Sequence, residues 1–330
     1  MVLVRIVYEE LQMAKKYNIG VDIGGTNVKI ALVDEKGVIA YSNSVPTRAE
    51  MGYEYTIQNI INTIKDSLKE SNNSISDIVG IGFGLPGQID SVNGVVRLLP
   101  NIPGWVEVPL AKIVQAEFKV PVKLDNDVRV ATLGELNFGA GKGCQNLVCL
   151  TVGTGVGSGI VLNGQLVRGA SMTAGEIGHV VVENNGQICG CGARGCLEAY
   201  ASGPSVVKMA KDYIAGGKST KFKEIAAGNE ITPFMVYEAA KQGDAVAKQI
   251  FNIVGEYLGI AMVSVVNLLN PEKIIVGGGV GQAGDLILEP VREAIRKRCI
   301  PTSAAAVQVV QAELGESAGV VGASILVSQK

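Results

Sequence analysis

Two glycine–threonine turns, one in each half of the chain, constrain the fold more than any other feature of the sequence. Gly25-Thr26 and Gly153-Thr154 each separate two apolar segments of strand length, and a third such segment follows in both halves. The expected strands are 18–23, 27–33 and 38–44 in the first half, and 146–152, 155–162 and 165–167 in the second. Because this pattern returns once, it predicts a duplicated β-β-β-α-β unit and therefore two α/β lobes.

Apolar residues at helical or strand spacing occupy much of the remaining chain, as α/β lobes require. Helices are expected over 55–72, 110–117, 130–138, 205–215, 232–242, 245–269 and 285–297, and strands over 78–83, 120–124 and 273–276. No linker-like segment separates the lobes, and we place the boundary near residue 126. Residues 1–12 precede a second methionine, Met13, and are expected to be a non-essential extension.

The charge of the chain limits its partners. There are 29 basic and 31 acidic residues, so the sequence lacks the basic excess with which proteins bind nucleic acid or anionic membranes. No apolar leader precedes the first strand, and the longest uncharged stretch, 143–167, is rich in glycine and indicates two strands rather than a membrane helix. We therefore expect a cytoplasmic protein with small-molecule partners.

The first turn, Asp22-Ile23-Gly24-Gly25-Thr26-Asn27, has the composition of a phosphate-binding loop. Glycines let backbone N–H groups approach an anion closely, and Thr26 adds a hydroxyl donor. Asp22, at the end of a strand, suits a hydrated Mg²⁺ ion, which prefers oxygen ligands. An ordinary hairpin turn is the alternative for this segment alone.

Two further glycine-rich segments support nucleotide binding. The alternate glycines of 153–159 weaken a strand unless a ligand approaches its backbone, so the two glycine–threonine turns together predict a bound nucleotide phosphate chain. The segment 277–284 matches a dinucleotide fingerprint, but the residues at 302–305 include no acidic partner for a ribose. We expect this segment to form a backbone wall for the adenosine end of ATP.

Three of the six cysteines gather near the only histidine of the chain. His179, Cys189, Cys191 and Cys196 together suit tetrahedral zinc, and four protein ligands make a closed structural site. Unligated thiols around a buried histidine are the alternative. If one ring nitrogen of His179 binds zinc, the other can only donate a hydrogen bond, so His179 orients a ligand and cannot act as a base.

A group of carboxylates and an amide suits a polyhydroxylated substrate. Asn126, Asp127, Glu176 and Glu198 carry the side chains that bind sugar hydroxyls, and phosphoryl transfer to a hydroxyl needs one base. For Asp127 the alternative is a helix N-cap at a strand–helix junction, and for the two glutamates it is a solvated surface position.

These segments together resemble the ROK family (repressors, open reading frames and kinases), and the likeness extends from about Met13 to the end of the chain. Its most specific part is Gly175-Glu176-Ile177-Gly178-His179 followed by Cys189-Gly190-Cys191-Gly192-Ala193-Arg194-Gly195-Cys196-Leu197-Glu198. The segments 22–26, 84–87, 126–127 and 271–279 follow the family's pattern in the expected order.

The resemblance implies a two-lobed actin-like ATPase fold, of the ribonuclease H-like and sugar kinase type, with a duplicated βββαβαβα unit. The small N-terminal lobe would be 13–125 plus 314–330, where a terminal helix returns to it. The larger C-terminal lobe, 126–313, would carry the zinc loop.

The resemblance also implies the activity of an ATP-dependent glucokinase, with direct in-line transfer from MgATP to the 6-hydroxyl of glucose. Asp127 would be the catalytic base. The sugar would be bound by Gly87, Asn101, Asn126, Asp127, Glu176, His179 and Glu198. ATP would be bound by Asp22, Gly24, Gly25, Thr26, Asn27, Gly153, Thr154, Gly155, Gly277, Gly278 and Gly279. The Zn²⁺ ion would be structural, and a homodimer or higher homo-oligomer is expected from the family.

The sequence departs from the family's pattern at two places and leaves alternatives open. Many relatives carry lysine where this chain has Asn27, and Arg129 adds a cation whose partner the sequence does not identify. The substrate could instead be fructose, N-acetylmannosamine, mannose or another hexose. A repressor without its DNA-binding module, since only about 17 residues precede the first strand, and a dinucleotide-dependent dehydrogenase are the other two alternatives.

Overall fold

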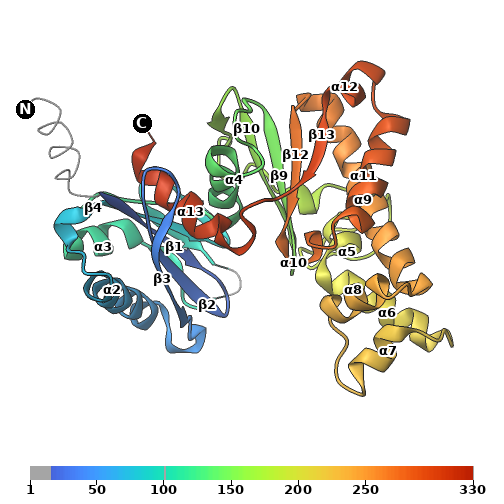
Figure 1. The fold of residues 1–330 in the computed structure, drawn as a ribbon, viewed down its shortest axis with the longest axis horizontal. Coiled ribbons are helices and arrows are strands. Elements are labelled where there is room, and N and C mark those ends of the chain that lie inside the picture. Colours follow the sequence, from blue (N-terminus) through green and yellow to red (C-terminus); the bar gives the residue numbers. More distant parts are fainter. Residues whose placement is uncertain (1–15, 100–101, 330) are drawn as a thin grey trace, which may run out of the picture. The chain divides into compact units, whose positions relative to one another are not determined.

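The computed structural model describes residues 16–99 and 102–329, which form two compact units (Figure 1). Unit 1 contains the described residues up to Gly134 and those from Ser317 onward, and unit 2 is Glu135–Glu316. The division therefore falls inside helix α4 (Asp127–Phe138) rather than before it, because the first turns of this helix pack on the sheet of unit 1. The extension expected at 1–12 lies outside the described residues.

Unit 1 is built on a five-stranded sheet with the order β3-β2-β1-β4-β8. Neighbouring strands are antiparallel along β1, β2 and β3, and parallel along β1, β4 and β8. The strands are β1 (Tyr17–Ile23), β2 (Asn27–Val33), β3 (Ile39–Pro46), β4 (Ile78–Leu85) and β8 (Val122–Asn126). The helices besides α4 are α2 (Tyr53–Glu70), α3 (Leu110–Phe118) and α13 (Ala318–Ile325).

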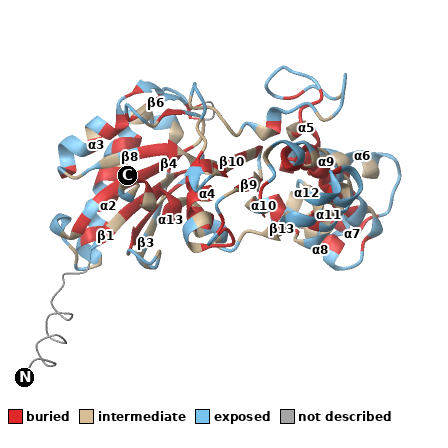
Figure 2. Cartoon of the chain, turned by 90° about the horizontal axis from the view of Figure 1, so that it is seen from above, coloured by how far each residue is buried: buried red, intermediate tan, exposed pale blue. Residues whose placement is uncertain are grey.

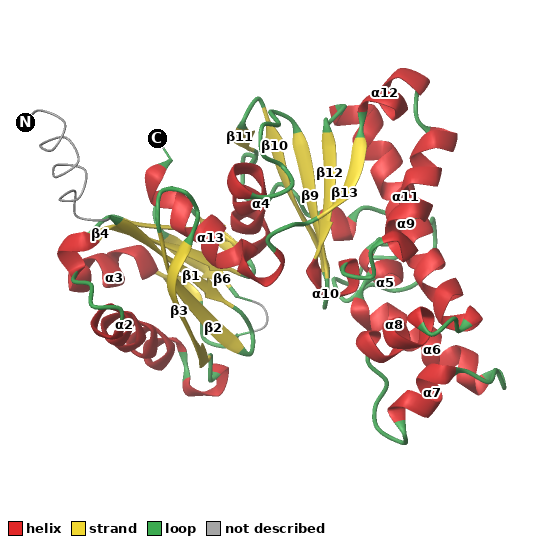
Figure 3. Ribbon diagram, viewed as in Figure 1, coloured by secondary structure: helices red, strands yellow, loops and turns green. Residues whose placement is uncertain are grey.

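Unit 2 repeats this topology with the order β11-β10-β9-β12-β13 (Figure 3). Each strand has the same relative direction as its counterpart in unit 1. The strands are β9 (Leu147–Val152), β10 (Val156–Leu162), β11 (Gln165–Leu166), β12 (Lys273–Gly277) and β13 (Gln308–Gln311). The duplicated unit predicted from the two glycine–threonine turns is confirmed.

The units differ in what is inserted between their strands. Unit 1 has a small sheet of β5 (Gln88–Asp90), β6 (Val95–Leu98) and β7 (Val106–Val108). Unit 2 has the helices α5 (Glu198–Ala201), α6 (Gly203–Ala215), α7 (Lys221–Ala226), α8 (Pro233–Lys241), α9 (Ala245–Leu269), α10 (Gly278–Gly281), α11 (Asp285–Arg298) and α12 (Pro301–Ala306). Several short elements, such as β5, β7, α5 and α10, were not predicted, because three or four residues are too few to show a hydrophobic period.

Helix α13 packs unusually closely on the sheet of unit 1, because glycines replace side chains on the face that it covers. A Cβ atom on Gly20 of β1 would lie 1.8 Å from the carbonyl oxygen of Val320, and one on Gly82 of β4 would lie 1.8 Å from that of Ala323. Both distances are far inside van der Waals contact, so only glycine allows this packing. The C-terminal helix is thereby fixed against the first strand of the chain (Figure 1).

Apolar side chains fill the opposite face of that sheet and the main core of unit 2. In unit 1 the alternate residues Ile19, Val21 and Ile23 of β1 pack with residues of α2 and α3. Buried residues follow the strands of this sheet in Figure 2. In unit 2, α9 and α11 form the core with β9 and β12. Helix α9 is long and apolar enough to cross a membrane by length and composition, but residues along it are buried in this core.

The glycine packing predicts a large loss of stability on a small substitution. Gly82→Ala should lower the free energy of unfolding by about 3 kcal/mol or more, because the added methyl group must displace the backbone of α13. Urea denaturation of the two proteins measures the change. Gly25→Ala is the matched control, since a Cβ atom there would meet no atom within 4 Å. Equal stability of Gly82→Ala and the wild-type protein would contradict the close packing.

Candidate functional site

A buried threonine, Thr47, supports the β1–β2 turn of unit 1 through two hydrogen bonds. The Gly24 N–H donates to the Asn27 carbonyl at 2.9 Å, which closes the turn. The Thr47 hydroxyl donates to the Gly24 carbonyl at 2.7 Å, and the Thr47 N–H donates to the Thr26 carbonyl at 2.9 Å. Thr47 has no exposed surface, whereas Gly25, Thr26 and Asn27 are exposed. The turn is therefore rigid while its backbone stays accessible.

Asp22, the predicted magnesium ligand, is half-buried on the face of β1 that α13 covers. A Cβ atom on Gly319, in the first turn of α13, would lie 2.3 Å from its carboxylate oxygen Oδ2. Burial, and then the negative charge of Asp127, raise the pKa of Asp22 to about 6, although Lys29 on the neighbouring strand opposes this. Two predicted site residues of unit 1, Asp22 and Asp127, are thus close enough to interact electrostatically.

The β8–α4 junction places Asn126 and Asp127 in different local roles. The Asn126 Oδ1 atom accepts hydrogen bonds from the N–H groups of Val128 at 3.0 Å and Arg129 at 3.3 Å, which makes Asn126 the helix N-cap. The N-cap alternative for Asp127 is therefore wrong, because Asp127 is the first helical residue. Asn126 also donates from Nδ2 to the Gly87 carbonyl at 3.4 Å, which brings two predicted sugar-binding residues together.

The structure identifies the partner of Arg129, which the sequence left open. Its Nε donates to Oδ1 of Asp125 at 2.6 Å, and the exposed fractions of the two side chains are only 3% and 0%. A buried charge requires such a partner, since leaving one ion alone in the interior is strongly destabilising. Arg129 is thus a buried structural cation that anchors the start of α4 to the end of β8. The i,i+4 spacing of the two residues was the available sequence signal.

The corresponding turn of unit 2, Gly153-Thr154-Gly155, is held by the chain segment that follows the cysteine loop. The Gly153 N–H donates to the Gly155 carbonyl at 2.9 Å, and the Gly203 N–H donates to the Gly153 carbonyl at 2.7 Å. On the other side of the turn, the Val156 N–H donates to Oε2 of Glu198 at 3.0 Å. Glu198 is therefore not the solvated surface residue of the alternative interpretation.

The third glycine segment differs from the loop expected there. Gly277 ends β12, and Gly278–Gly281 form the short helix α10. Gly278 has a φ of +83°, and a Cβ atom on it would lie 2.5 Å from the carbonyl oxygen of Val152. This glycine is therefore required by close packing on β9.

In each of the three segments, one glycine is required neither by close packing nor by its backbone conformation. Cβ atoms built on Gly25, Gly153 and Gly279 would meet no atom within 4 Å, and none of the three has a backbone conformation that excludes side chains. The missing side chain therefore serves neither the turn nor the packing of the described residues. Each position leaves backbone open to an approaching ligand, as a phosphate group requires.

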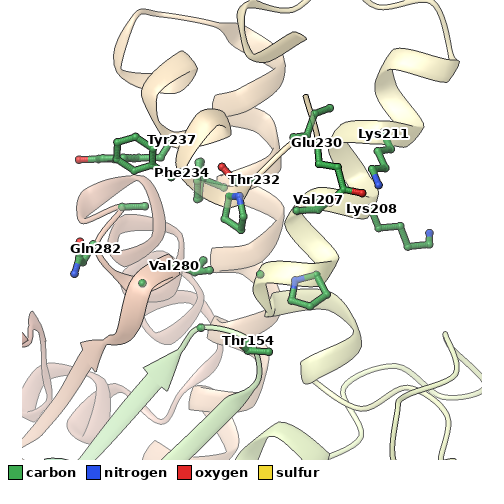
Figure 4. A pocket seen from close by; sticks show the side chains of 18 of the residues that line it. Thr154, Val207, Lys208, Lys211, Glu230, Thr232, Phe234, Tyr237, Val280 and Gln282 are labelled. Carbon is green, nitrogen blue, oxygen red and sulfur yellow. The ribbon is translucent and has the colours of Figure 1, made fainter. Parts of the chain in front are cut away.

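Two of these open glycines meet at a cavity of about 1010 Å³ in unit 2. Gly153, Thr154 and Gly279 line one part of it, and the rest is lined mainly by residues of α6, α8 and α10 and of the segment 230–232 (Figure 4). The labelled side chains are Thr154, Val207, Lys208, Lys211, Glu230, Thr232, Phe234, Tyr237, Val280 and Gln282. Phe234 is 67% exposed, which is unusual for a large apolar side chain. The cavity combines apolar surface with two lysines, Lys208 and Lys211, and three acidic residues, Asp212, Glu230 and Glu316, so its walls can contact both an aromatic group and polar groups.

The predicted metal ligands of unit 2 come together with the geometry of a four-ligand site. One ligand atom from each of His179, Cys189, Cys191 and Cys196 lies within 4.8 Å of the others. The Cys191 and Cys196 sulfurs are 3.8 Å apart, and the Cys189 sulfur is 3.8 Å from Nδ1 of His179. In a zinc tetrahedron with Zn–S bonds of about 2.3 Å, two sulfurs are about 3.8 Å apart. The residues therefore fit zinc.

A pair of stacked tyrosines, which the sequence did not reveal, anchors the cysteine loop to helix α9. The rings of Tyr200 and Tyr257 are stacked with centroids 4.2 Å apart. The Tyr257 hydroxyl donates to Oε2 of Glu183 at 3.0 Å, and the Tyr200 hydroxyl accepts from the Gln187 N–H at 2.6 Å. Burial, together with the Glu183 carboxylate, raises the pKa of Tyr257 to about 12, so this hydroxyl remains a donor at neutral pH.

The remaining predicted sugar-binding residues lie around this loop, with one exception. His179 and Glu176 are exposed, and His179 turns Nδ1 toward Cys189. Glu198 begins α5, and its Oε1 atom is 3.9 Å from the Cys189 sulfur. Asn101 lies outside the described residues. The structure thus groups Glu198, His179 and the cysteines in unit 2, and Asp22, Gly87, Asn126 and Asp127 in unit 1.

Comparison with known proteins finds a matching family model and a solved structure of the same family. The model of the ROK family matches residues 18–330. The glucokinase of Halalkalibacterium halodurans is 38% identical over 320 residues, which cover 96% of this chain and 97% of that protein. The xylose repressor of Caldicellulosiruptor bescii is 33% identical over 309 residues, covering 94% and 77%. A crystal structure of a ROK family glucokinase from Streptomyces griseus, in complex with glucose and AMPPNP, has a TM-score of 0.80 at 35% identity and covers 95% of this chain and 100% of that one.

The raised pKa of Asp22 predicts a characteristic pH dependence of stability. The folded protein binds the Asp22 proton more tightly than the unfolded chain does, so ionisation of this carboxyl destabilises the fold as the pH rises through about 6. Asp22→Asn should therefore gain up to about 3 kcal/mol of unfolding free energy relative to wild type between pH 4 and pH 7. Urea denaturation across this range measures the difference. A difference that does not change with pH would show that the Asp22 carboxyl is not perturbed.

Proposed function

The chain belongs to the ROK family, and on that premise we propose that it is a glucokinase, which transfers the γ-phosphoryl group of MgATP to the 6-hydroxyl of glucose. Its two corresponding units are the duplicated halves of the actin-like ATPase fold. The observation that carries the proposal is the set of three open glycines, because they offer accessible backbone in all three predicted nucleotide-binding segments.

We propose that the cavity of unit 2 binds the nucleotide. Its exposed aromatic residue, Phe234, offers a stacking surface for a base, and Gly153, Thr154 and Gly279 offer backbone and hydroxyl donors for phosphates. In unit 1 we assign the residues Asp22, Gly24, Gly25, Thr26 and Asn27 to ATP and its magnesium ion, and in unit 2 also Gly155, Gly277 and Gly278. Bound Mg²⁺ would neutralise charge on the phosphate oxygens, and the Asp22 carboxylate is the oxygen ligand that suits its hydrated form.

Asp127 is the base in this proposal. It begins α4, beside the capping residue Asn126, and its Oδ1 atom accepts a hydrogen bond from the Val128 N–H at 2.9 Å, so the helix start fixes its position. The base takes the proton of the sugar hydroxyl as its oxygen attacks the γ-phosphorus in line with the leaving ADP oxygen. No phosphoenzyme is formed. The P–O bond to ADP breaks as the new bond to the sugar oxygen forms.

We assign the remaining hydroxyls of the sugar to Gly87, Asn101 and Asn126 of the N-terminal half and to Glu176, His179 and Glu198. A zinc ion bound by His179, Cys189, Cys191 and Cys196 would stiffen the loop that carries His179 and Glu198. With Nδ1 directed at the metal position, His179 keeps its other ring nitrogen as a donor to an oxygen. The stacked tyrosines support the same loop from α9.

The relatives also support a second candidate, a sugar-responsive regulator. The xylose repressor matches this chain over 77% of its own length, so the shared part is compatible with sugar binding in either class. We favour the kinase because of the open glycines and the relatives named glucokinase. We further propose that the protein acts in the cytoplasm as a homodimer or higher oligomer, without nucleic acid or membrane partners.

A coupled assay of ADP release with MgATP and a panel of hexoses tests the function. We expect the highest kcat/KM for glucose, with fructose, mannose and N-acetylmannosamine well below it. Asp127→Asn should lower kcat by about 10²–10⁴-fold, because a general base contributes that much. Asp66→Asn removes a carboxylate from an exposed position on α2 and should keep wild-type turnover. No turnover with any hexose, or full turnover in Asp127→Asn, would contradict the proposal.

Removal of zinc tests the role of the cysteine loop. We expect about one zinc ion per chain in the purified protein, measured by mass spectrometry of the metal. Cys191→Ser should lose this zinc and raise the KM for glucose more than the KM for ATP, because the loop carries sugar-binding residues. Cys144→Ser, at a buried cysteine outside the cluster, is the control and should retain zinc. A wild-type protein without zinc that phosphorylates glucose normally would refute a structural role for the metal.

A further inference from the structure

The carboxylate of Glu198 contacts two parts of unit 2 that have different predicted roles. Its Oε2 atom accepts a hydrogen bond at 3.0 Å from the N–H of Val156, the residue after the Gly153-Thr154-Gly155 turn. Its Oε1 atom is 3.9 Å from the sulfur of Cys189 in the cysteine loop. One half-buried side chain therefore joins the predicted nucleotide loop to the predicted sugar-binding loop.

Gly155 shows how tightly the two parts fit. A Cβ atom at this position would lie 2.5 Å from Oε2 of Glu198, and no other described atom outside that side chain would come within 4 Å. The backbone of Gly155 is not in the left-handed region, so its conformation does not demand glycine. The residue is small because the Glu198 carboxylate packs directly on its backbone.

The chain segment that follows Glu198 also hydrogen-bonds to the turn, at its first residue, Gly153. The Ser202 N–H donates to the Glu198 carbonyl at 3.3 Å, and the next residue, Gly203, donates its N–H to the Gly153 carbonyl at 2.7 Å. Residues 198–203 therefore hydrogen-bond to both sides of the turn, at Gly153 and at Val156. A shift of the turn changes the position that the Glu198 carboxylate can occupy, and a shift of the carboxylate removes the acceptor of the Val156 N–H.

We propose that the Gly155–Glu198 contact couples nucleotide binding to sugar binding, with Gly155 as a positioning residue for the sugar-binding carboxylate. This inference rests on the proposed function and extends it. A nucleotide that orders the 153–155 turn also fixes the orientation in which Glu198 meets a sugar hydroxyl. By thermodynamic linkage, a bound sugar that orders Glu198 must tighten nucleotide binding by the same factor.

Titration calorimetry with glucose alone, in the absence of nucleotide, tests the contact. Gly155→Ala should weaken the Kd for glucose about tenfold, although residue 155 belongs to the predicted nucleotide loop, because the methyl group displaces the Glu198 carboxylate. Gly153→Ala is the matched control: it is the same change in the same turn, but its Cβ atom would meet nothing, and the Kd for glucose should stay within about twofold of wild type.

The reciprocal experiment measures binding of AMPPNP without sugar. Glu198→Asp shortens the side chain so that it no longer reaches the Val156 N–H, and it should weaken the Kd for AMPPNP about fivefold or more. Circular dichroism and zinc content establish that each variant is folded.

An unchanged glucose Kd in folded Gly155→Ala, or an unchanged AMPPNP Kd in folded Glu198→Asp, overturns the coupling alone if the wild-type protein phosphorylates glucose. Absence of hexose turnover in the wild-type protein would overturn the proposed function and, with it, the coupling.

Discussion

The packing of α13 on the sheet of unit 1 through backbone atoms is the contact on which the rest of that unit depends. Gly20 and Gly82 remove the side chains that would separate helix from sheet, so the carbonyls of Val320 and Ala323 approach the strands directly. This approach also brings Gly319 against the carboxylate of Asp22. The burial that raises the pKa of Asp22 is thus a consequence of fixing the last helix to the first strand.

Local patterns predicted the architecture, because each long element shows its own period. Helix α9 begins and ends where the sequence places it, and the repeated glycine–threonine turns predicted the topology shared by both sheets. The clustering of His179 with Cys189, Cys191 and Cys196 was also predictable, since the three cysteines are close in the sequence and their spacing alone is informative. A signal confined to one segment can be read without knowledge of the tertiary structure.

The contacts that support the site could not be predicted in this way. Thr47 braces a turn more than twenty residues away, and Tyr257 reaches Glu183 from the opposite end of a long insertion. The sequence could not show which residue caps α4, because Asn126 and Asp127 are both good N-cap residues. Only the hydrogen bonds in the structure distinguish them. Each of these contacts depends on which residues the fold brings together. The hydrophobic periodicity of the sequence does not contain that information.

The glycine–threonine turn of each unit needs hydrogen-bond partners that hold it in place. The two units supply these partners from different parts of the chain. In unit 1 the strand after the hairpin, β3, is eight residues long, and Thr47, the residue that follows it, hydrogen-bonds directly to the turn. In unit 2 the corresponding strand, β11, has two residues and ends well short of the turn. Support there comes instead from the insertion, through Glu198 and Gly203. Because that insertion also carries the cysteine loop, one segment of the chain supports the second turn and presents residues that we assign to the sugar.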